Sequence, residues 1–272
     1  MSAASSAGDE TLYPDLKKKV AVITGGHSGL GRAISEALAK AGSKVVIAAR
    51  SLEKCASLAN QIKAVGGEAV PIRLDVTDPT SIEEMINQVK DRWGPIDLLV
   101  NNAGIQGKID WIVNYDPTEW DRIMAVLLKG PFLCCRAVLP DMIGRRSGKV
   151  VNVAAGVSDE RVDYGVAAYY AAKAGLINFT RQCAAETKRY GIYVNAIDPA
   201  GLETAMTDEI LAVEQGSSEF SGTQTNSGRG LRLRKPEAIV PMVLFLLSTT
   251  SNMMTGRLLQ ASSPDDVQYL QL

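Results

Sequence analysis

The chain has 272 residues, of which 46% are apolar and 22% charged, and its formal net charge is −1. This balance is typical of a soluble globular protein and excludes collagen, a coiled coil and wholesale disorder. A nucleic-acid binder that works through counterion release needs a surplus of basic residues. The chain has no such surplus, so we expect no nucleic acid among its partners.

Cysteine and histidine are scarce in this sequence. The four cysteines form no Cys-x-x-Cys pair, and His27 is the only histidine. A zinc site would need mostly carboxylate ligands, so we expect no metal. Unpaired cysteines suggest a reducing compartment, no apolar run reaches the length of about 18 residues needed to span a membrane, and the N-terminus resembles no targeting signal. We therefore expect a cytoplasmic protein without a membrane partner.

Short apolar runs rich in β-formers alternate with longer helical patterns along the chain. Strands are predicted at 19–25, 44–49, 69–74, 97–101, 149–153, 192–197 and 257–260. Helices are predicted at 29–41, 52–65, 79–93, 117–143, 167–190 and 236–247. Uniformly apolar strands are typical of a parallel sheet covered on both faces. The pattern predicts a doubly wound, Rossmann-like α/β fold with roughly seven strands.

We expect one domain over residues 16–272, preceded by a disordered tail at 1–15, since no linker or internal repeat interrupts the alternation. One segment, 214–230, is rich in Ser, Gly, Thr and Gln and lacks apolar anchors. Its place after the sixth strand favours a mobile substrate lid around 203–232. A tolerated insertion is the alternative.

A glycine-rich turn follows the first predicted strand and leads into a helix. Glycines let bare backbone approach a pyrophosphate, and the helix N-terminus then faces that anion. The order strand, turn, helix predicts dinucleotide binding, whereas a purely structural turn is the alternative. The residues expected to contact the dinucleotide here are Gly25, His27, Ser28, Gly29, Leu30 and Gly31.

The end of the second strand bears on the choice between NAD and NADP. An acid here would bind the ribose 2′-OH of NAD, but Arg50 follows the strand instead. A guanidinium can pair with a 2′-phosphate, so we predict NADP, with help from Ser51 or His27, and consider NAD less fitting. The alternative is a solvated arginine.

Two further strand ends add expected cofactor contacts. Asp75, followed by Val76, can accept a hydrogen bond from an adenine amine, although a solvated or capping aspartate is the alternative. Asn101 and Asn102 end the fourth strand, and their amides can tie neighbouring strands together. Small residues beside them let a ribose lie against the backbone, which adds Asn102, Ala103 and Gly104 to the expected contacts.

Tyr169 and Lys173 lie four residues apart in a helical segment and therefore share one face. A phenol with a pKa near 10 is a poor acid–base catalyst at neutral pH. A neighbouring ammonium lowers that pKa, so the tyrosine can exchange a proton with a carbonyl or alcohol oxygen during hydride transfer.

These motifs together resemble the short-chain dehydrogenase/reductase superfamily, in its compact single-domain branch, from about Leu16 to Gln260. The resemblance implies an NAD(P)-dependent oxidoreductase with Tyr169 as acid/base and Lys173 on the nicotinamide ribose. It also implies a homodimer or homotetramer built on the helices at 117–143 and 167–190. The segment after the sixth strand would border the nicotinamide, through Pro199, Leu202 and Thr204.

The sequence departs from the family pattern at two usual catalytic positions. Ala155 lies where the family has a serine that binds the substrate oxygen, and Leu127 lies where it has an asparagine that supports a proton relay. The D-G-G ending after the last strand is also absent. Nearby groups offer substitutes: Ser158, Tyr164 and Tyr170 as donors, or Asp159 and Asp163 beside a cationic substrate such as an iminium.

The leading hypothesis is an NADP(H)-dependent oxidoreductase acting on a carbonyl, alcohol, imine or amine of a small organic molecule. The departures at Leu127 and Ala155 keep two alternatives open. In the first alternative, the protein is a non-redox or bifunctional biosynthetic enzyme, such as a cyclase or isomerase. In the second, it is a catalytically inactive subunit.

Overall fold

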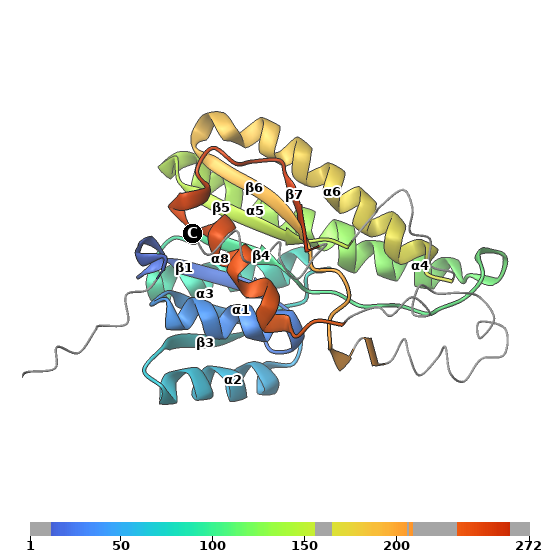
Figure 1. The fold of residues 1–272 in the computed structure, drawn as a ribbon, viewed down its shortest axis with the longest axis horizontal. Coiled ribbons are helices and arrows are strands. Elements are labelled where there is room, and N and C mark those ends of the chain that lie inside the picture. Colours follow the sequence, from blue (N-terminus) through green and yellow to red (C-terminus); the bar gives the residue numbers. More distant parts are fainter. Residues whose placement is uncertain (1–11, 156–164, 206, 209–232, 262–272) are drawn as a thin grey trace, which may run out of the picture.

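A computed structural model describes residues 12–155, 165–205, 207–208 and 233–261. They form a seven-stranded sheet in the order β3-β2-β1-β4-β5-β6-β7, and every neighbouring pair is parallel. The strands are β1 (Val20–Thr24), β2 (Lys44–Ala49), β3 (Glu68–Arg73), β4 (Leu98–Asn101), β5 (Gly148–Val153), β6 (Ile192–Asp198) and β7 (Leu258–Gln260). The predicted doubly wound α/β fold is confirmed (Figure 1).

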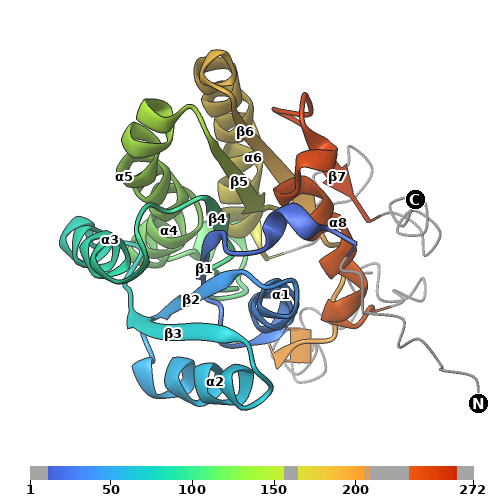
Figure 2. The ribbon, with the colours of Figure 1, turned by 90° about the vertical axis from the view of Figure 1, so that its left-hand side faces the viewer.

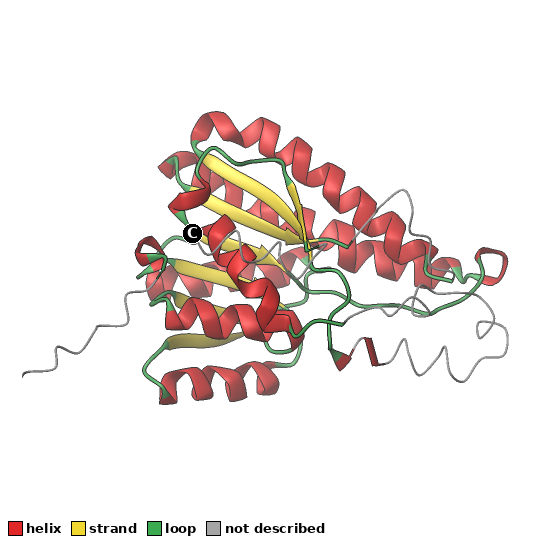
Figure 3. Cartoon of the chain, in the orientation of Figure 1, coloured by secondary structure: helices red, strands yellow, loops and turns green. Residues whose placement is uncertain are grey.

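Helices cover both faces of the sheet, so the molecule has three layers. Figure 2 shows α3 and α5 on one side of the sheet and α1 and α8 on the other, and Figure 3 shows the same layering as red helices around yellow strands. The α-helices are α1 (Gly29–Lys40), α2 (Leu52–Ala64), α3 (Pro79–Trp93), α4 (Pro117–Met124), α5 (Gly130–Arg145), α6 (Ala167–Thr187) and α8 (Val240–Leu247). Shorter helical turns are η1 (Pro14–Leu16), η2 (Ile112–Asn114), η3 (Ala125–Lys129), η4 (Lys188–Tyr190), η6 (Pro236–Ile239) and η7 (Thr249–Ser251).

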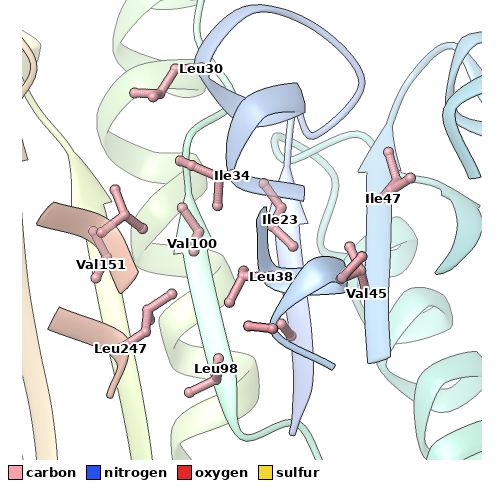
Figure 4. Packing of buried hydrophobic residues seen from close by; sticks show 14 of the residues in the cluster. Ile23, Leu30, Ile34, Leu38, Val45, Ile47, Leu98, Val100, Val151 and Leu247 are labelled. Atoms are coloured by element: carbon pink, nitrogen blue, oxygen red, sulfur yellow. The ribbon is translucent and has the colours of Figure 1, made fainter. Parts of the chain in front are cut away.

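The strands are buried on both faces, which explains their continuous apolar sequences. On one face Ile23 and Val100 pack beneath Ile34 and Leu38 of α1 (Figure 4). On the other face, strand residues such as Leu99 pack against α3 and α5. The side chains along each strand enter the two cores alternately, because successive strand residues point to opposite faces.

The helix predicted at 117–143 is interrupted in the structure. Between α4 and α5, η3 forms a π-helical turn in which the N–H of Gly130 donates to the carbonyl of Ala125. Pro131 has no N–H, so it cannot donate to the carbonyl of Leu127 as an α-helix requires. The wider turn resolves this conflict, and such bulges are frequent at functional sites.

The run of α4, η3 and α5, Pro117–Arg145, is long and apolar enough to pass a membrane-span test by length and composition. This is weak evidence, because the core helix of a globular protein passes the same test. Here Leu133, Val138 and Met142 of the run are buried against the sheet.

The strand order changes direction beside β1, since β2 lies on one side of it and β4 on the other. In doubly wound sheets this switch opens a crevice at the carboxyl ends of the strands, where ligands bind. The described residues that directly follow β1, β2, β4, β5 and β6 lie at this edge, because parallel strands end at the same side of a sheet.

Two expected segments fall largely outside the described residues: the N-terminal tail and the lid at 203–232. The described chain begins within the expected tail. Tyr13 there is buried, and the carboxylate of Asp15 accepts a hydrogen bond of 2.7 Å from the backbone N–H of Thr249. The folded part thus includes residues that we assigned to the tail.

Candidate active site

The turn after β1 is built for close backbone approach. Gly25 has a φ of +64°, and a Cβ on it would lie 2.9 Å from the Cα of Ala103. A Cβ on Gly31 would lie 2.5 Å from the side-chain nitrogen of Asn102. Only glycine fits either position, so β1, α1 and the loop after β4 meet with almost no space between them.

The N-terminus of α1 has features of an anion site. Its N-cap residue, Ser28, makes no side-chain capping hydrogen bond, so the first N–H groups of the helix are left to another acceptor. The neighbouring Nδ1 of His27 is buried and has no hydrogen-bond partner among the residues that the structure describes. Orphaned donors at a glycine turn fit the pyrophosphate of a dinucleotide. The side chain of Leu30 is buried in the core, so only its backbone is available.

A second group of positive charges lies beyond β2. Arg50 is exposed directly after the strand, and Lys54 lies in the first turn of α2, whose N-cap Ser51 makes no side-chain capping bond. Burial is the main cause that lowers the pKa of the His27 imidazole, and the positive charge of nearby Lys54 lowers it further. Cations are unfavourable at a helix N-terminus unless an anion joins them. This corner of the crevice therefore fits a phosphate.

Asp75 lies beside this corner. Its Oδ1 accepts hydrogen bonds from the hydroxyl and the N–H of Thr77, which lower the pKa of the carboxyl; the charge of Arg50 contributes less. The capping interpretation thus accounts for one carboxylate oxygen. The side chain of Val76 is buried against Gly130 of α5.

The asparagines after β4 tie neighbouring strands together, as their sequence suggested. Asn102 donates from its side chain to the carbonyls of Thr24 and Gly25, at 3.0 and 3.2 Å. The buried Asn101 donates at 2.8 Å to Asn152 of β5. Ala103 and Gly104 follow at the crevice edge, where Gly104 is exposed.

Tyr169 and Lys173 share one face of α6 at the carboxyl edge of the sheet. The ammonium nitrogen lies 5.6 Å from the centre of the Tyr169 ring and donates a 2.6 Å hydrogen bond to the carbonyl of Val153. Burial lowers the pKa of the Lys173 ammonium to about 8, and the charge of Asp198 opposes that effect. Tyr170 contacts the Tyr169 ring edge to face at 5.6 Å.

The segment after β6 lies against the glycine turn. A Cβ on Gly29 would lie 3.4 Å from the side chain of Thr204, so the two elements are in contact. Leu202 is buried in the core, and Pro199 is buried as well. Any contact that Leu202 makes in the crevice is therefore through its backbone.

Leu127 and Ala155 are the two residues that the family resemblance predicts at usual catalytic positions. Leu127 is 1% exposed and packs with Ala168 and Ala172 of α6 in a cluster that Tyr169 borders. Ala155 follows β5 and is half-buried. Of the suggested substitutes, only Tyr170 belongs to the described residues. The others, Ser158, Asp159, Asp163 and Tyr164, lie outside them.

Comparison with known proteins decides the family. The model of the short chain dehydrogenase family matches residues 19–215. The chain belongs to this family.

Several relatives share nearly its full length. It is 35% identical over 244 residues to a 3-oxoacyl-[acyl-carrier-protein] reductase of Thermotoga maritima, covering 90% of this chain and 96% of the relative. It is 34% identical over 244 residues to an uncharacterised oxidoreductase of Bacillus subtilis, YxbG, covering 89% and 88%. Among solved structures, actinorhodin polyketide ketoreductase with NADPH superposes with a TM-score of 0.81 at 29% identity, covering 91% and 96%. The chain is therefore an oxidoreductase of a family that binds nicotinamide cofactors.

Two residues at this site were missed by sequence reasoning. Lys54 lies four residues after Arg50, at the first turn of the helix that follows β2, and this spacing was a usable signal. Asp198 is a buried acid at the last position of β6, in a strand that is otherwise nearly all apolar. Among the described residues, no three His, Cys, Asp or Glu side chains gather as a metal site would require.

Proposed function

We propose that this protein is an NADP(H)-dependent oxidoreductase. It transfers hydride between the nicotinamide and a carbonyl, alcohol, imine or amine of a small organic molecule. The observation that carries the proposal is the pairing of Tyr169 with the buried ammonium of Lys173 at the edge where the glycine turn lies. The relatives that are reductases of carbonyl groups support the same reaction type.

In this proposal Tyr169 is the general acid in reduction and the general base in oxidation. Its hydroxyl gives a proton to the substrate oxygen as that oxygen gains charge, and the charge of Lys173 stabilises the resulting phenolate. Lys173 also presents N–H donors toward a ribose. The nicotinamide, when bound, supplies or accepts the hydride.

Replacement of one oxygen tests this role. Tyr169→Phe should abolish turnover of NADPH with a carbonyl substrate found by screening, while leaving the NADPH dissociation constant nearly unchanged. Because the edge-to-face ring contact with Tyr170 is retained, the fold should persist. Unchanged turnover in the variant would refute the role of Tyr169.

The preference for NADP rests on positive charge at the crevice corner. Arg50 would pair with the 2′-phosphate, with Lys54 and His27 close by and the uncapped N-terminus of α2 beside them. NAD brings no phosphate to that corner. The bound form of one structural neighbour, with NADPH, is in keeping with this choice.

A second candidate function follows from Leu127 and Ala155. In this candidate, Leu127 in the cluster that Tyr169 borders and Ala155 after β5 occupy the positions of two polar catalytic groups, and their apolar side chains would weaken stabilisation of a charged oxygen. A non-redox reaction such as cyclisation or isomerisation, with Tyr169 as acid/base, needs less of it. A product of unchanged oxidation state without net NADPH consumption would favour this candidate. A protein with no activity on any substrate would favour the inactive alternative.

We further propose a cytoplasmic homodimer or homotetramer that binds neither nucleic acid nor membrane. Less than half of the most apolar stretch of the α4–α5 run, 44%, is buried within one chain. Phe132 of α5 is 43% exposed next to Phe179 of α6. A second copy covering these helices would bury the remaining apolar surface.

A further inference from the structure

The acid at the end of β6 has no role in the function proposed above. Asp198 is 7% exposed, and burial of a carboxylate is costly unless its charge is compensated. Among the described residues, its side chain accepts hydrogen bonds from two neutral donors: the N–H of Ala200 at 3.0 Å and the side-chain amide of Gln260 at 3.4 Å. Because neutral donors leave its negative charge uncompensated, we expect a positive charge near the buried carboxylate.

The strand alternation places Asp198 on the face that α6 covers. Ile197 packs in the cluster with Val151 and Val153, on the α1 side of the sheet. Ala196 packs with Ala154 and Ile177 of α6, on the other side. Asp198 is two residues beyond Ala196, so its side chain points to the same face.

The helix register then brings Lys173 opposite Asp198. Helix α6 starts at the carboxyl edge after β5 and runs back toward the start of β6, antiparallel to the strands. Lys173 is one turn, about 5.4 Å, closer to that edge than Ile177. Asp198 is two strand residues, about 6.6 Å, closer than Ala196. The two offsets match, so Lys173 faces Asp198 as Ile177 faces Ala196.

We propose that Asp198 is a positioning residue of the Tyr169–Lys173 centre, whose buried carboxylate keeps the ammonium of Lys173 charged. Among the described residues no ion pair within 4.0 Å joins the two, so the carboxylate acts through space and leaves the N–H groups of the ammonium for other partners. The inference deepens the proposed function, because a charged Lys173 is what favours the Tyr169 phenolate.

The surroundings of Lys173 make this contribution necessary. Tyr169 on the same helix, the carbonyl of Val153 on β5 and Asp198 on β6 are the described groups that face the ammonium. Its pKa is already lowered to about 8 by burial with Asp198 in place. Without the carboxylate, a large share of Lys173 would be neutral near pH 7.

The test measures the ionisation of Lys173 directly in the protein without coenzyme. Lysine labelled with ¹³C at Cε is titrated by NMR, and the Lys173 signal is assigned by its loss in Lys173→Met. In Asp198→Asn, which retains an oxygen to accept from Ala200, the pKa should fall by about one unit or more. Gln260→Leu removes the other hydrogen bond but keeps the charge, so it should leave that pKa unchanged.

A second readout links the titration to the centre. The pH above which NADPH binding weakens should move to more acidic values in Asp198→Asn and stay in place in Gln260→Leu. If Asp198→Asn does not fold, Asp198→Ser serves, since a hydroxyl also accepts from the turn. A Lys173 pKa that is equal in wild type and a folded Asp198 variant overturns the inference. The proposed function fails separately, if Tyr169→Phe retains turnover.

Discussion

The side-chain amide of Asn102 donates to the backbone carbonyl of Gly25, joining the loop after β4 to the glycine turn after β1. The same amide also holds the carbonyl of Thr24, so the two loops that border the dinucleotide crevice are fixed to each other. Gly31 lies directly against this amide. The shape of the crevice therefore depends on the absence of a side chain at Gly31, in the first turn of α1.

Gly31→Ala should disrupt this junction. The added methyl group would meet the Asn102 amide at 2.5 Å as well as the carbonyl of Gly25, so both loops must shift. We expect a loss of about 1 to 3 kcal/mol in the free energy of unfolding, as for other overpacked sites, together with weaker coenzyme binding.

Gly144→Ala is the matched control, because nothing lies within 4 Å of its Cβ position in α5. That helix variant should be more stable by about 0.5 to 1 kcal/mol. Equal stability of the two variants in urea unfolding would contradict this account.

Arg50→Ala should weaken NADPH binding far more than NADH binding. A charged hydrogen bond contributes about 1.5 to 3 kcal/mol, so the NADPH dissociation constant should rise about tenfold to a hundredfold. Lys54→Ala should have a smaller effect in the same direction, near 0.5 to 1 kcal/mol or about threefold, because its side chain is exposed. Lys63→Ala, in the last turn of the same helix, is the control and should change neither constant. An equal loss for both coenzymes in Arg50→Ala would argue against 2′-phosphate recognition.

The fold was predictable because its signals are local. The continuous apolar runs of β1, β2 and β5 and the helical patterns between them specify a parallel sheet covered on both faces. The strands matched the predicted ranges to within about one residue, which is closer than such boundaries usually come. The π-helical turn at η3 was not predicted, although Pro131 within an otherwise helical pattern was a signal for an interruption.

The site was predictable where it depends on motifs and not where it depends on register. Tyr169 and Lys173 follow from helical spacing, and Asn102 from its place after β4. The position of Asp198 opposite Lys173 requires the pairing of β5 with β6 and the placement of α6 on one face, which only the folded chain supplies. The buried environment of Leu127 likewise depends on how η3 packs against α6.

Ala155→Ser should raise carbonyl reduction. If the wild-type protein already reduces a ketone with NADPH, the added hydroxyl should increase kcat by about a hundred- to a thousandfold, the effect of one oxyanion donor. The double variant adds Leu127→Asn to Ala155→Ser. Leu127→Asn places an amide in an apolar cluster and should cost about 2 to 4 kcal/mol of stability. Leu127→Met, which keeps the position apolar, is the comparison for that cost. Ketone reduction that appears only in the double variant would instead favour the non-redox or inactive alternative.

Phe132→Glu should convert the proposed oligomer to monomers. The exposed ring on α5 would be replaced by a carboxylate, and burying that charge against a second copy is strongly unfavourable. Light scattering after gel filtration measures the mass. Val65→Glu, at an 85% exposed apolar position after α2, controls for added charge and should leave the mass unchanged. A wild-type protein that is monomeric at all concentrations would contradict the proposal.

Lys149 should make the stability of the protein depend on pH. Its ammonium is buried under the carbonyl of Ser248 and 2.9 Å from the hydroxyl of Ser251, and burial lowers its pKa from 10.5 to about 8. Between these two values the unfolded chain binds a proton that the folded chain has released. The free energy of unfolding therefore gains a contribution that grows as the pH rises from about 8 to about 10.5, by about 2 to 3 kcal/mol in all.

Lys149→Met lacks this contribution. The difference in stability between wild type and variant, measured in urea, should thus increase in favour of the wild type over that interval. Cysteine thiols with raised pKa values act in the opposite direction, but they are present in both proteins and cancel in the difference. A difference that stays constant from about pH 7 to about pH 10 would show that Lys149 keeps its ordinary ionisation when folded.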